Sequence, residues 1–413
     1  MHYGMEEKLP GLKSHADIGI MQSYLLSFLS GSVVALSYVF LPLRIIAANS
    51  IDYDTMGIII FVFLLFFLLS RIPSGLMAAS EYRNFAAPTA FLLLSASLFE
   101  LYTATVLEQF LLSALALGAA MSFAIVAINA KLSESYSSQK IGFRKWLALL
   151  LGVLSFPFIL GFDALTRIQY LQLMFYLVLI LLVLGAFFLV AAIIGFYSKN
   201  GRPLRDDMFA TVSKTFAPLR MLSKIDKKGY FLSTLLIDTL FVFSAWSIII
   251  YLPYYSYKLL NSVPSLLVTF TIVSLFYLGM RFAGQKLKSD SFRFASYFFR
   301  PVAFIIAFFM LSLATTFDFI LYALLVLASV GIFEEGAKQF VEFSFSKEDR
   351  QIVRRASKLL KMPFVVLAPL FSYEFFSIST SLGFASAIIP AAISLLISTF
   401  AVSNNSLRVF APS

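Results

Sequence analysis

The stretch LSRIPSGLMAASEYRNF, residues 69–85, ends a long apolar run with Arg71 and places Arg83 twelve positions later. A second stretch, GMRFAGQKLKSDSFRF at residues 279–294, holds Arg281 and Arg293 at the same spacing, 210 residues further along. That offset is about half of the 413-residue chain. Internal similarity at a fixed distance is the sequence signature of a repeated architecture. The two stretches therefore predict a repeat along the whole chain.

Four more matches follow in the same order, all at offsets between 207 and 213 residues. They pair FLPL at 40–43 with YLPY at 251–254, PTAF at 88–91 with PVAF at 301–304, the AK pairs at 130–131 and 337–338, and Pro157 with Pro369. Collinear matches of this kind predict two halves, 1–197 and 230–413, joined by the basic linker 198–229. The linker is either a short helix on the membrane surface or a disordered tether.

The composition identifies the class of protein. Hydrophobic residues make up 60% of the chain and charged residues 13%, whereas soluble domains carry about 25% charged residues. A helix needs roughly 20 apolar residues to cross a bilayer core. Twelve segments meet that length and predict an all-α polytopic membrane protein with six helices in each half. They lie near 18–43, 56–79, 85–106, 109–130, 146–165, 170–197, 230–257, 262–282, 297–317, 318–336, 359–379 and 381–402.

The net charge of +10 has an uneven distribution. If the N-terminus is cytoplasmic, the outer segments hold only Arg44, Arg167 and Lys258, and Arg71 and Arg300 fall inside helices. The other basic residues lie in the inner segments, so the positive-inside rule predicts that both termini are cytoplasmic. The charge therefore indicates orientation in a membrane and contact with lipid rather than nucleic-acid binding. The chain has no cysteine, which excludes thiolate metal sites and disulfides, and we expect no metal or cofactor.

The two six-helix halves, the cytoplasmic termini and the long central loop resemble the major facilitator superfamily of secondary transporters. The loop between the second and third helices of that family follows the pattern Gly-x-Leu-Ala-Asp-Arg-x-Gly-Arg-Arg. On this sequence Gly75, Met77, Ala78 and Arg83 occupy pattern positions, and Ala79 stands where the family has aspartate. The second-half copy keeps Leu287 and Arg293 and has Asp290 one position beyond the expected acid.

The resemblance implies that this loop helps to close an inner gate by charge pairing between the halves. Two glutamates near the inner end of the tenth span are expected to join it through ion pairs with Lys338, Arg71 or Arg281, although one of the two could face the cavity instead. The predicted gate residues are Arg71, Gly75, Arg83, Arg281, Asp290, Arg293, Glu334 and Glu335.

The fifth span carries a weaker indication. GVLSFPFILG at 152–161 keeps Gly152, Pro157 and Gly161 of a Gly-x-x-x-Gly-Pro-x-x-Gly-Gly signature associated with the antiporters of the family. The alternative is that proline and glycine only shape a packed membrane helix.

Asp238 is the acid that most needs an explanation. It lies ten residues past Lys228, which at 1.5 Å per residue places it about 15 Å into the membrane. An ionisable side chain at that depth costs about 2.5–3.5 kcal/mol on insertion scales. The equivalent residue of the first half is Ser27, so the charge is not part of the repeat. We expect Asp238 to couple transport to protons or to bind a cationic substrate; the alternative is a structural acid that is hydrogen-bonded to a hydroxyl.

The other cavity candidates are polar or aromatic residues, for each of which packing is the competing explanation. Trp246 is the best placed, because it lies two helical turns beyond Asp238. The candidates are Gln22, Tyr24, Tyr38, Asn129, Trp246, Tyr251 and Tyr254.

An enzyme is disfavoured because both histidines, His2 and His15, lie in the N-terminal tail and the predicted outer loops are short. A channel is disfavoured because no helix carries a repeated polar stripe. We expect a monomeric, multi-pass secondary transporter of the cell membrane that works by alternating access. Proton-coupled efflux of a lipophilic or cationic compound is the first hypothesis, which makes the protein an antiporter. The alternatives are a proton-coupled uptake symporter of a small metabolite and a non-coupled lipid-handling protein.

Overall fold

The computed structural model describes residues 20–37, 53–79, 81–134, 147–155, 170–197, 230–249, 251–252, 255–256, 263–287, 289–343 and 349–403. These residues are almost entirely helical, with no strand among them, as expected for an all-α protein. The predicted linker 198–229 lies outside them.

The helices follow one another in two series. The first series comprises the helix Ile20–Ser37, α2 (Tyr53–Leu69), α3 (Arg71–Ala79), the 3-10 turn η1 (Glu81–Phe85), α4 (Ala86–Thr103), α5 (Leu107–Glu134), helical residues 147–155 and α7 (Tyr170–Tyr197). The second comprises α9 (Tyr230–Ile249), α11 (Val263–Lys286), α12 (Asp290–Leu313), α13 (Phe317–Phe343), α14 (Asp349–Ile378), α15 (Thr380–Ser386) and α16 (Ile388–Ser403).

Nine helices within the described residues are long and apolar enough to cross a membrane. The chain is therefore an α-helical multi-pass membrane protein. The three other expected spans coincide with helical residues 147–155, with α9 and with α11. The count of twelve spans and the orientation of the termini stay predictions.

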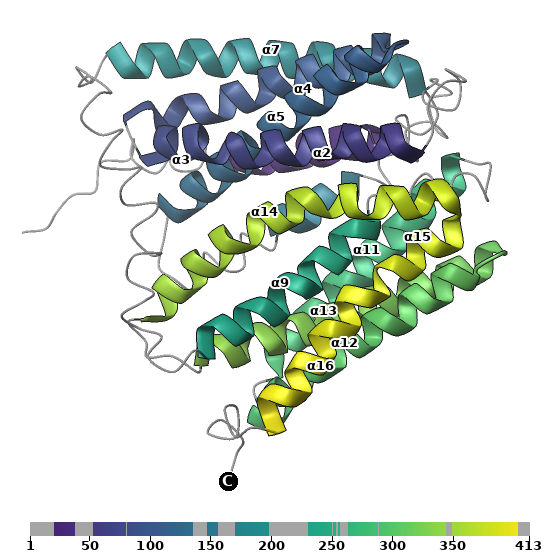
Figure 1. Cartoon of the computed structure of the whole chain (residues 1–413). Helices are drawn as coiled ribbons and strands as arrows, with labels where there is room; N and C mark the ends of the chain where they lie inside the picture. Colours follow the sequence, from purple (N-terminus) through teal and green to yellow (C-terminus); the bar gives the residue numbers. More distant parts are fainter. Residues whose placement is uncertain are drawn as a thin grey trace, which may run out of the picture.

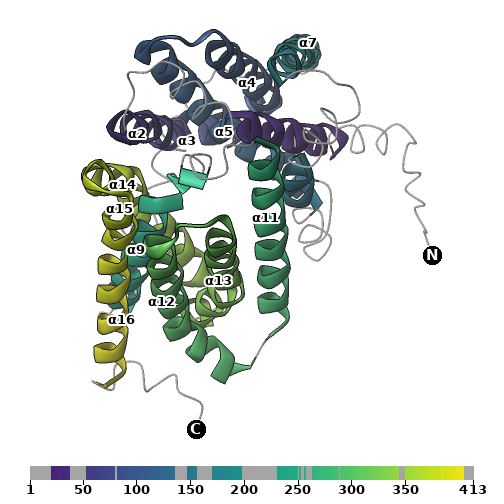
Figure 2. The ribbon, with the colours of Figure 1, turned by 90° about the vertical axis from the view of Figure 1, so that its right-hand side faces the viewer.

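Helix packing repeats between the two halves. In the first half α5 packs on α4 and α2, and α4 packs on α7; in the second half α13 packs on α12 and α11, and α12 packs on α16. Figures 1 and 2 show the two groups of helices stacked one above the other. The turns 104–106 and 314–316 have the same three-residue length and lie 210 residues apart. The backbone thus repeats at the offset found in the sequence, although the domain boundaries remain predicted.

The two halves meet where α2 packs on α14. A Cβ atom added to Gly57 would lie 2.7 Å from Tyr251 Oη and 2.9 Å from Tyr373 Cβ, so only glycine allows this approach. Figure 1 shows the two ribbons close together at the right and diverging toward the left, where α3 lies. The halves therefore touch at the end of α2 that is remote from Arg83, which the charge distribution predicts to be the outer end.

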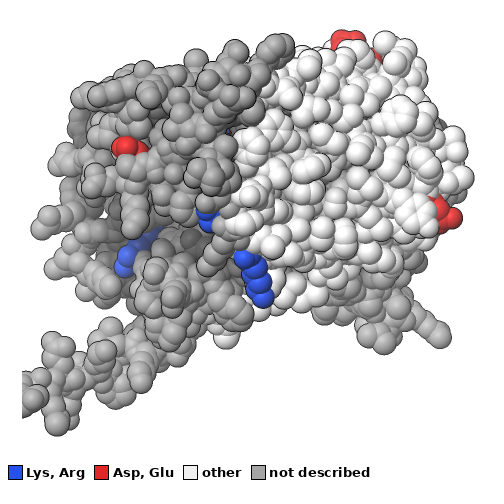
Figure 3. Space-filling view, turned by 90° about the horizontal axis from the view of Figure 1, so that it is seen from below, with Lys and Arg blue, Asp and Glu red and all other residues white. Residues whose placement is uncertain are grey.

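Charge is also distributed unevenly over the surface. In Figure 3 the described surface is mostly uncharged, with Asp or Glu at two places on its edge, and the visible Lys and Arg side chains lie left of centre. Apolar side chains such as Val183, Phe187 and Ile194 of α7 are more than 60% exposed. A surface of this kind is stable in contact with lipid and unfavourable in water.

Candidate functional site

A cavity of about 660 Å³ lies between helices of both halves. Val34, Leu149 and Val153 line it from the first half. The larger part of its wall comes from the second half and is rich in aromatic side chains. These residues are Phe241, Trp246, Leu252, Phe270, Ser274, Tyr277, Leu278, Phe304, Leu324 and Glu334, with several smaller apolar side chains between them.

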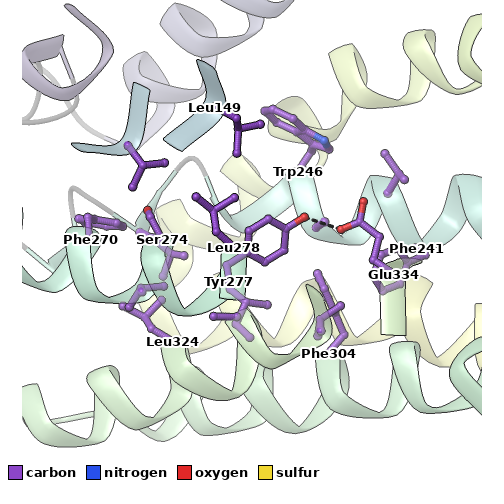
Figure 4. Close-up of a pocket in the computed structure, with 18 of the residues that line it drawn as sticks. Leu149, Phe241, Trp246, Phe270, Ser274, Tyr277, Leu278, Phe304, Leu324 and Glu334 are labelled. Atoms are coloured by element: carbon purple, nitrogen blue, oxygen red, sulfur yellow. Dashed lines mark hydrogen bonds between the residues drawn. The ribbon is translucent and has the colours of Figure 1, made fainter. Parts of the chain in front are cut away.

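Glu334 is the one charged side chain among the described residues that line this cavity. It projects from α13, and its Oε2 atom accepts a hydrogen bond of 2.5 Å from the hydroxyl of Tyr277 on α11. Figure 4 shows the two side chains pointing toward each other, with Trp246 above them in that view. A carboxylate in apolar surroundings is costly unless it is paired, so this one is suited to attract a cation or a proton.

Trp246, a predicted cavity residue, does line the cavity. Phe241, Val242 and Ala245, which lie within five residues of it in α9, also line the cavity. Aromatic faces attract organic cations within about 6 Å of the ring. An acid beside tryptophan, phenylalanine and tyrosine side chains therefore provides the elements of a site for a lipophilic cation.

Asp238 lies in a separate cluster and is not among the described residues that line the cavity. Arg300 of α12 donates from Nη2 to its Oδ1 atom, and Lys361 of α14 donates from Nζ to its Oδ2 atom. The side chains of Asp238, Arg300 and Lys361 are 18%, 5% and 19% exposed. The Arg300 guanidinium also lies 4.1 Å from the centre of the Phe241 ring. We call these three residues the charge cluster.

The two cations of the charge cluster were missed by reasoning from the sequence. Arg300 was recognised as an arginine within a helix, and Lys361 falls at the start of the eleventh span, but neither was matched to Asp238. The signal was the depth of Asp238, because a buried carboxylate is tolerated only with counter-ions. This pairing favours Glu334 over Asp238 as the acid available to a ligand. The expected role of Asp238 in coupling or substrate binding has no direct support from these contacts.

The remaining cavity candidates fall into three groups. Tyr251 is fully buried and donates to the carbonyl of Pro369 at 3.1 Å, and Asn129 is exposed and donates to the carbonyl of Ile125 in its own helix at 2.7 Å. Both bonds are typical of structural residues. Gln22 and Tyr24 lie in the first helix without lining the cavity. Tyr38 and Tyr254 lie outside the described residues.

The predicted gate residues differ between the halves. Arg71 begins α3, one residue after α2 ends. Ser70 between them keeps helical backbone hydrogen bonds, donating to the Phe66 carbonyl and accepting from the N–H of Ser74. The guanidinium of Arg71 lies 4.6 Å from the centre of the Phe67 ring, and its Nε atom is buried without a hydrogen-bond partner among the described residues. Arg281, its counterpart, lies inside the unbroken helix α11. The backbones around the two arginines therefore differ by a local irregularity at Ser70.

The other gate predictions concern the helix ends. Arg83 is exposed in η1, and Arg293 lies in the first turn of α12. Asp290 is the first residue of α12. Around Gly75 a Cβ atom would meet nothing within 4 Å. Glu335 follows Glu334 in α13. Gating by these residues stays a prediction.

The signature glycine of the fifth span packs closely against the first helix. A Cβ atom on Gly31 would lie 2.2 Å from the carbonyl oxygen of Gly152. This contact favours the packing interpretation for Gly152. Pro157 and Gly161 lie outside the described residues.

No family model and no curated protein matches the sequence. Solved structures do match it over nearly its whole length. A bacterial homologue of the human lysosomal transporter Spinster, in an inward-facing and unoccupied conformation, matches with a TM-score of 0.65 at 13% identity, covering 96% of this chain and 98% of that one. A variant of the nucleoside transporter NupG matches with a TM-score of 0.64 at 14% identity, covering 93% and 99%.

The xylose transporter XylE from E. coli, in a partially occluded inward-open conformation, matches with a TM-score of 0.57 at 13% identity, covering 95% of this chain and 100% of that one. Identities this low establish a shared fold. The predicted resemblance is confirmed at that level: the chain has the fold of the major facilitator superfamily of transporters.

Proposed function

We propose that this protein is a secondary active transporter of the cell membrane that exports a lipophilic cation in exchange for protons. The observation that carries the proposal is the cavity between the halves, whose described lining is apolar and aromatic except for a few polar groups and the single carboxylate of Glu334. The shared fold with nucleoside, xylose and Spinster-type transporters supports transport of a small molecule.

Exchange follows if the cation and the proton compete for Glu334. Substrate binding from the inner side displaces a proton from the carboxylate, and protonation from the outer side releases the substrate. Each ligand shifts the conformational equilibrium only by its differential affinity for the two states. Rocking of one half against the other, as in folds built from parallel repeats, then exposes the site to each side in turn.

The test is transport of ethidium into proteoliposomes that contain the purified protein, driven by an inside-acid pH gradient. We expect Glu334→Gln to reduce the initial rate at least tenfold, because the variant binds neither the cation nor the exchanged proton. Glu374→Gln is the matched control, since Glu374 also accepts a 2.5 Å hydrogen bond from a tyrosine, Tyr373, but is exposed and outside the cavity. Its rate should stay close to that of the wild type.

Each alternative function gives a different result. An outside-acid gradient that drives ethidium uptake would favour a symporter. Uptake that is independent of any pH gradient would favour a non-coupled carrier. An unchanged rate in Glu334→Gln would contradict the proposed site.

A further inference from the structure

The charge cluster has one acid and two bases, so it carries a net charge of +1. Burying a charge is costly unless it is paired. The Nε atom of Arg300 is buried without a hydrogen-bond partner among the described residues. Lys361 has three donor hydrogens, of which Asp238 takes one, and its side chain is 19% exposed. The described cluster therefore has spare positive charge and spare donors.

The fold itself does not require these charges. The equivalent positions in the first half are Ser27, Ala87 and Leu149, at offsets of 211, 213 and 212 residues. There Ser27 donates to the carbonyl of Ala148, and this bond joins the same two helices of the repeat that the pair Asp238–Lys361 joins in the second half. One hydrogen bond is enough to link the pair, so packing does not account for the charge cluster.

The charge cluster adjoins the cavity at the end where Glu334 lies. Asp238 and Arg300 each precede a residue of the cavity wall, Phe241 and Phe304, by about one helical turn. Phe299 precedes Arg300 in α12, and Phe333 precedes Glu334 in α13. The centres of these two rings lie 5.9 Å apart, so these turns of α12 and α13 are side by side.

In the repeat, position 361 is equivalent to a residue of the cavity wall. Leu149, its first-half equivalent, is 43% exposed and lines the cavity. Lys361 itself bonds to Asp238 and is not among the described residues that line the cavity, so the equivalence with Leu149 indicates on which side of the helix the cavity lies and not a contact with it.

We propose that Arg300 and Lys361 bind an anionic group, a carboxylate or a phosphate, of the same molecule whose cationic group binds Glu334. The transported molecule is then a zwitterion with an apolar body. This inference rests on the proposed function, because it takes the cavity as the substrate site. Asp238 is a positioning residue in this arrangement: it holds the two cations in place and neutralises one of them.

The test compares probes that share one apolar chain, measured as binding to the purified protein in nanodiscs. Octyltrimethylammonium carries only the cation; octyl betaine adds a carboxylate, and octylphosphocholine adds a phosphate. We expect at least one zwitterion to bind about tenfold more tightly than the cation, which corresponds to one added charge-assisted contact. The better of the two zwitterions identifies the preferred anionic group.

Two variants assign the preference to the charge cluster. Lys361→Gln should lower the affinity for the preferred zwitterion about tenfold, to that of the cation, and leave cation binding unchanged. Lys361→Arg, which keeps the charge, should retain most of the preference. Equal binding of all three probes by the wild type would overturn the inference while leaving the proposed function intact. A preference that survives Lys361→Gln would also overturn it. If Glu334→Gln binds octyltrimethylammonium as tightly as the wild type does, the proposed function would instead be overturned.

Discussion

The two halves of this transporter fold join equivalent helices through different contacts. Where the first half joins its first and fifth helices with the hydroxyl of Ser27, the second half joins the corresponding helices through Asp238 and Lys361. Ala87, buried to 3% exposure, corresponds to Arg300, buried to 4%. In both halves the two helices pack together: α9 packs on α14, and the first helix approaches residues 147–155 closely at Gly31 and Gly152. A buried salt bridge is weak evidence for stability, so the difference supports the proposal that the charges of the second half serve ligand binding.

The largest effect is expected from converting one residue of the charge cluster to its first-half equivalent. Asp238→Ser should lower the free energy of unfolding by about 3–5 kcal/mol, because it leaves two buried cations without their counter-ion. The measurement is thermal unfolding in detergent, read against the wild type under identical conditions.

The matched control removes all three charges together. We call Asp238→Ser/Arg300→Met/Lys361→Leu the uncharged variant. Its methionine fills the volume of the arginine. Replacing a buried ion cluster by apolar residues is often neutral or stabilising. The unfolding temperature should return close to that of the wild type. A triple variant as unstable as Asp238→Ser would mean that the second half needs its charges to fold.

A smaller effect is expected at the contact between the halves. Gly57→Leu should disfavour closure of α2 on α14 by about 1–3 kcal/mol, because the new side chain overlaps Tyr251 and Tyr373. The second-half equivalent, Val268, is 39% exposed, so a larger side chain is tolerated there.

The measurement is cysteine labelling. Because the chain has no cysteine, a single Leu252→Cys reports opening of the contact as faster reaction with an external maleimide. Gly279→Leu is the control, since nothing lies within 4 Å of a Cβ atom there; faster labelling in that variant would point to a non-specific effect.

The smallest effect is expected in the first half. Ser27→Ala removes one hydrogen bond to the Ala148 carbonyl, so it should cost about 1 kcal/mol, the usual value of such a bond. Thermal unfolding again measures it. A loss as large as that of Asp238→Ser would remove the contrast between the halves.

The sequence predicted the architecture well because the membrane imposes it. The length of the apolar segments predicted the helical class. Five collinear matches predicted the repeat, and with it the resemblance in fold. The predicted ends of the helices were less accurate. Helix α14 begins at Asp349, ten residues before the expected span. A helix continues past its apolar segment wherever its backbone hydrogen bonds are satisfied.

The site was predicted only in part. Trp246 follows from its position on one helix face, and Glu334 was recognised as an acid that could face the cavity. The pairing of Asp238 with Arg300 and Lys361 joins three helices separated by about 60 residues each along the chain, and single-sequence periodicity carries no information on which helices become neighbours. The small difference between the backbones at Arg71 and Arg281 was also hidden, since the local irregularity at Ser70 is a feature that the matching spacing does not reveal.

The most direct test of the account is probe binding to the uncharged variant. If the charge cluster serves the ligand and not the fold, this variant should fold, bind octyltrimethylammonium as the wild type does, and lose the preference for octyl betaine or octylphosphocholine. A folded variant that keeps that preference would contradict the account.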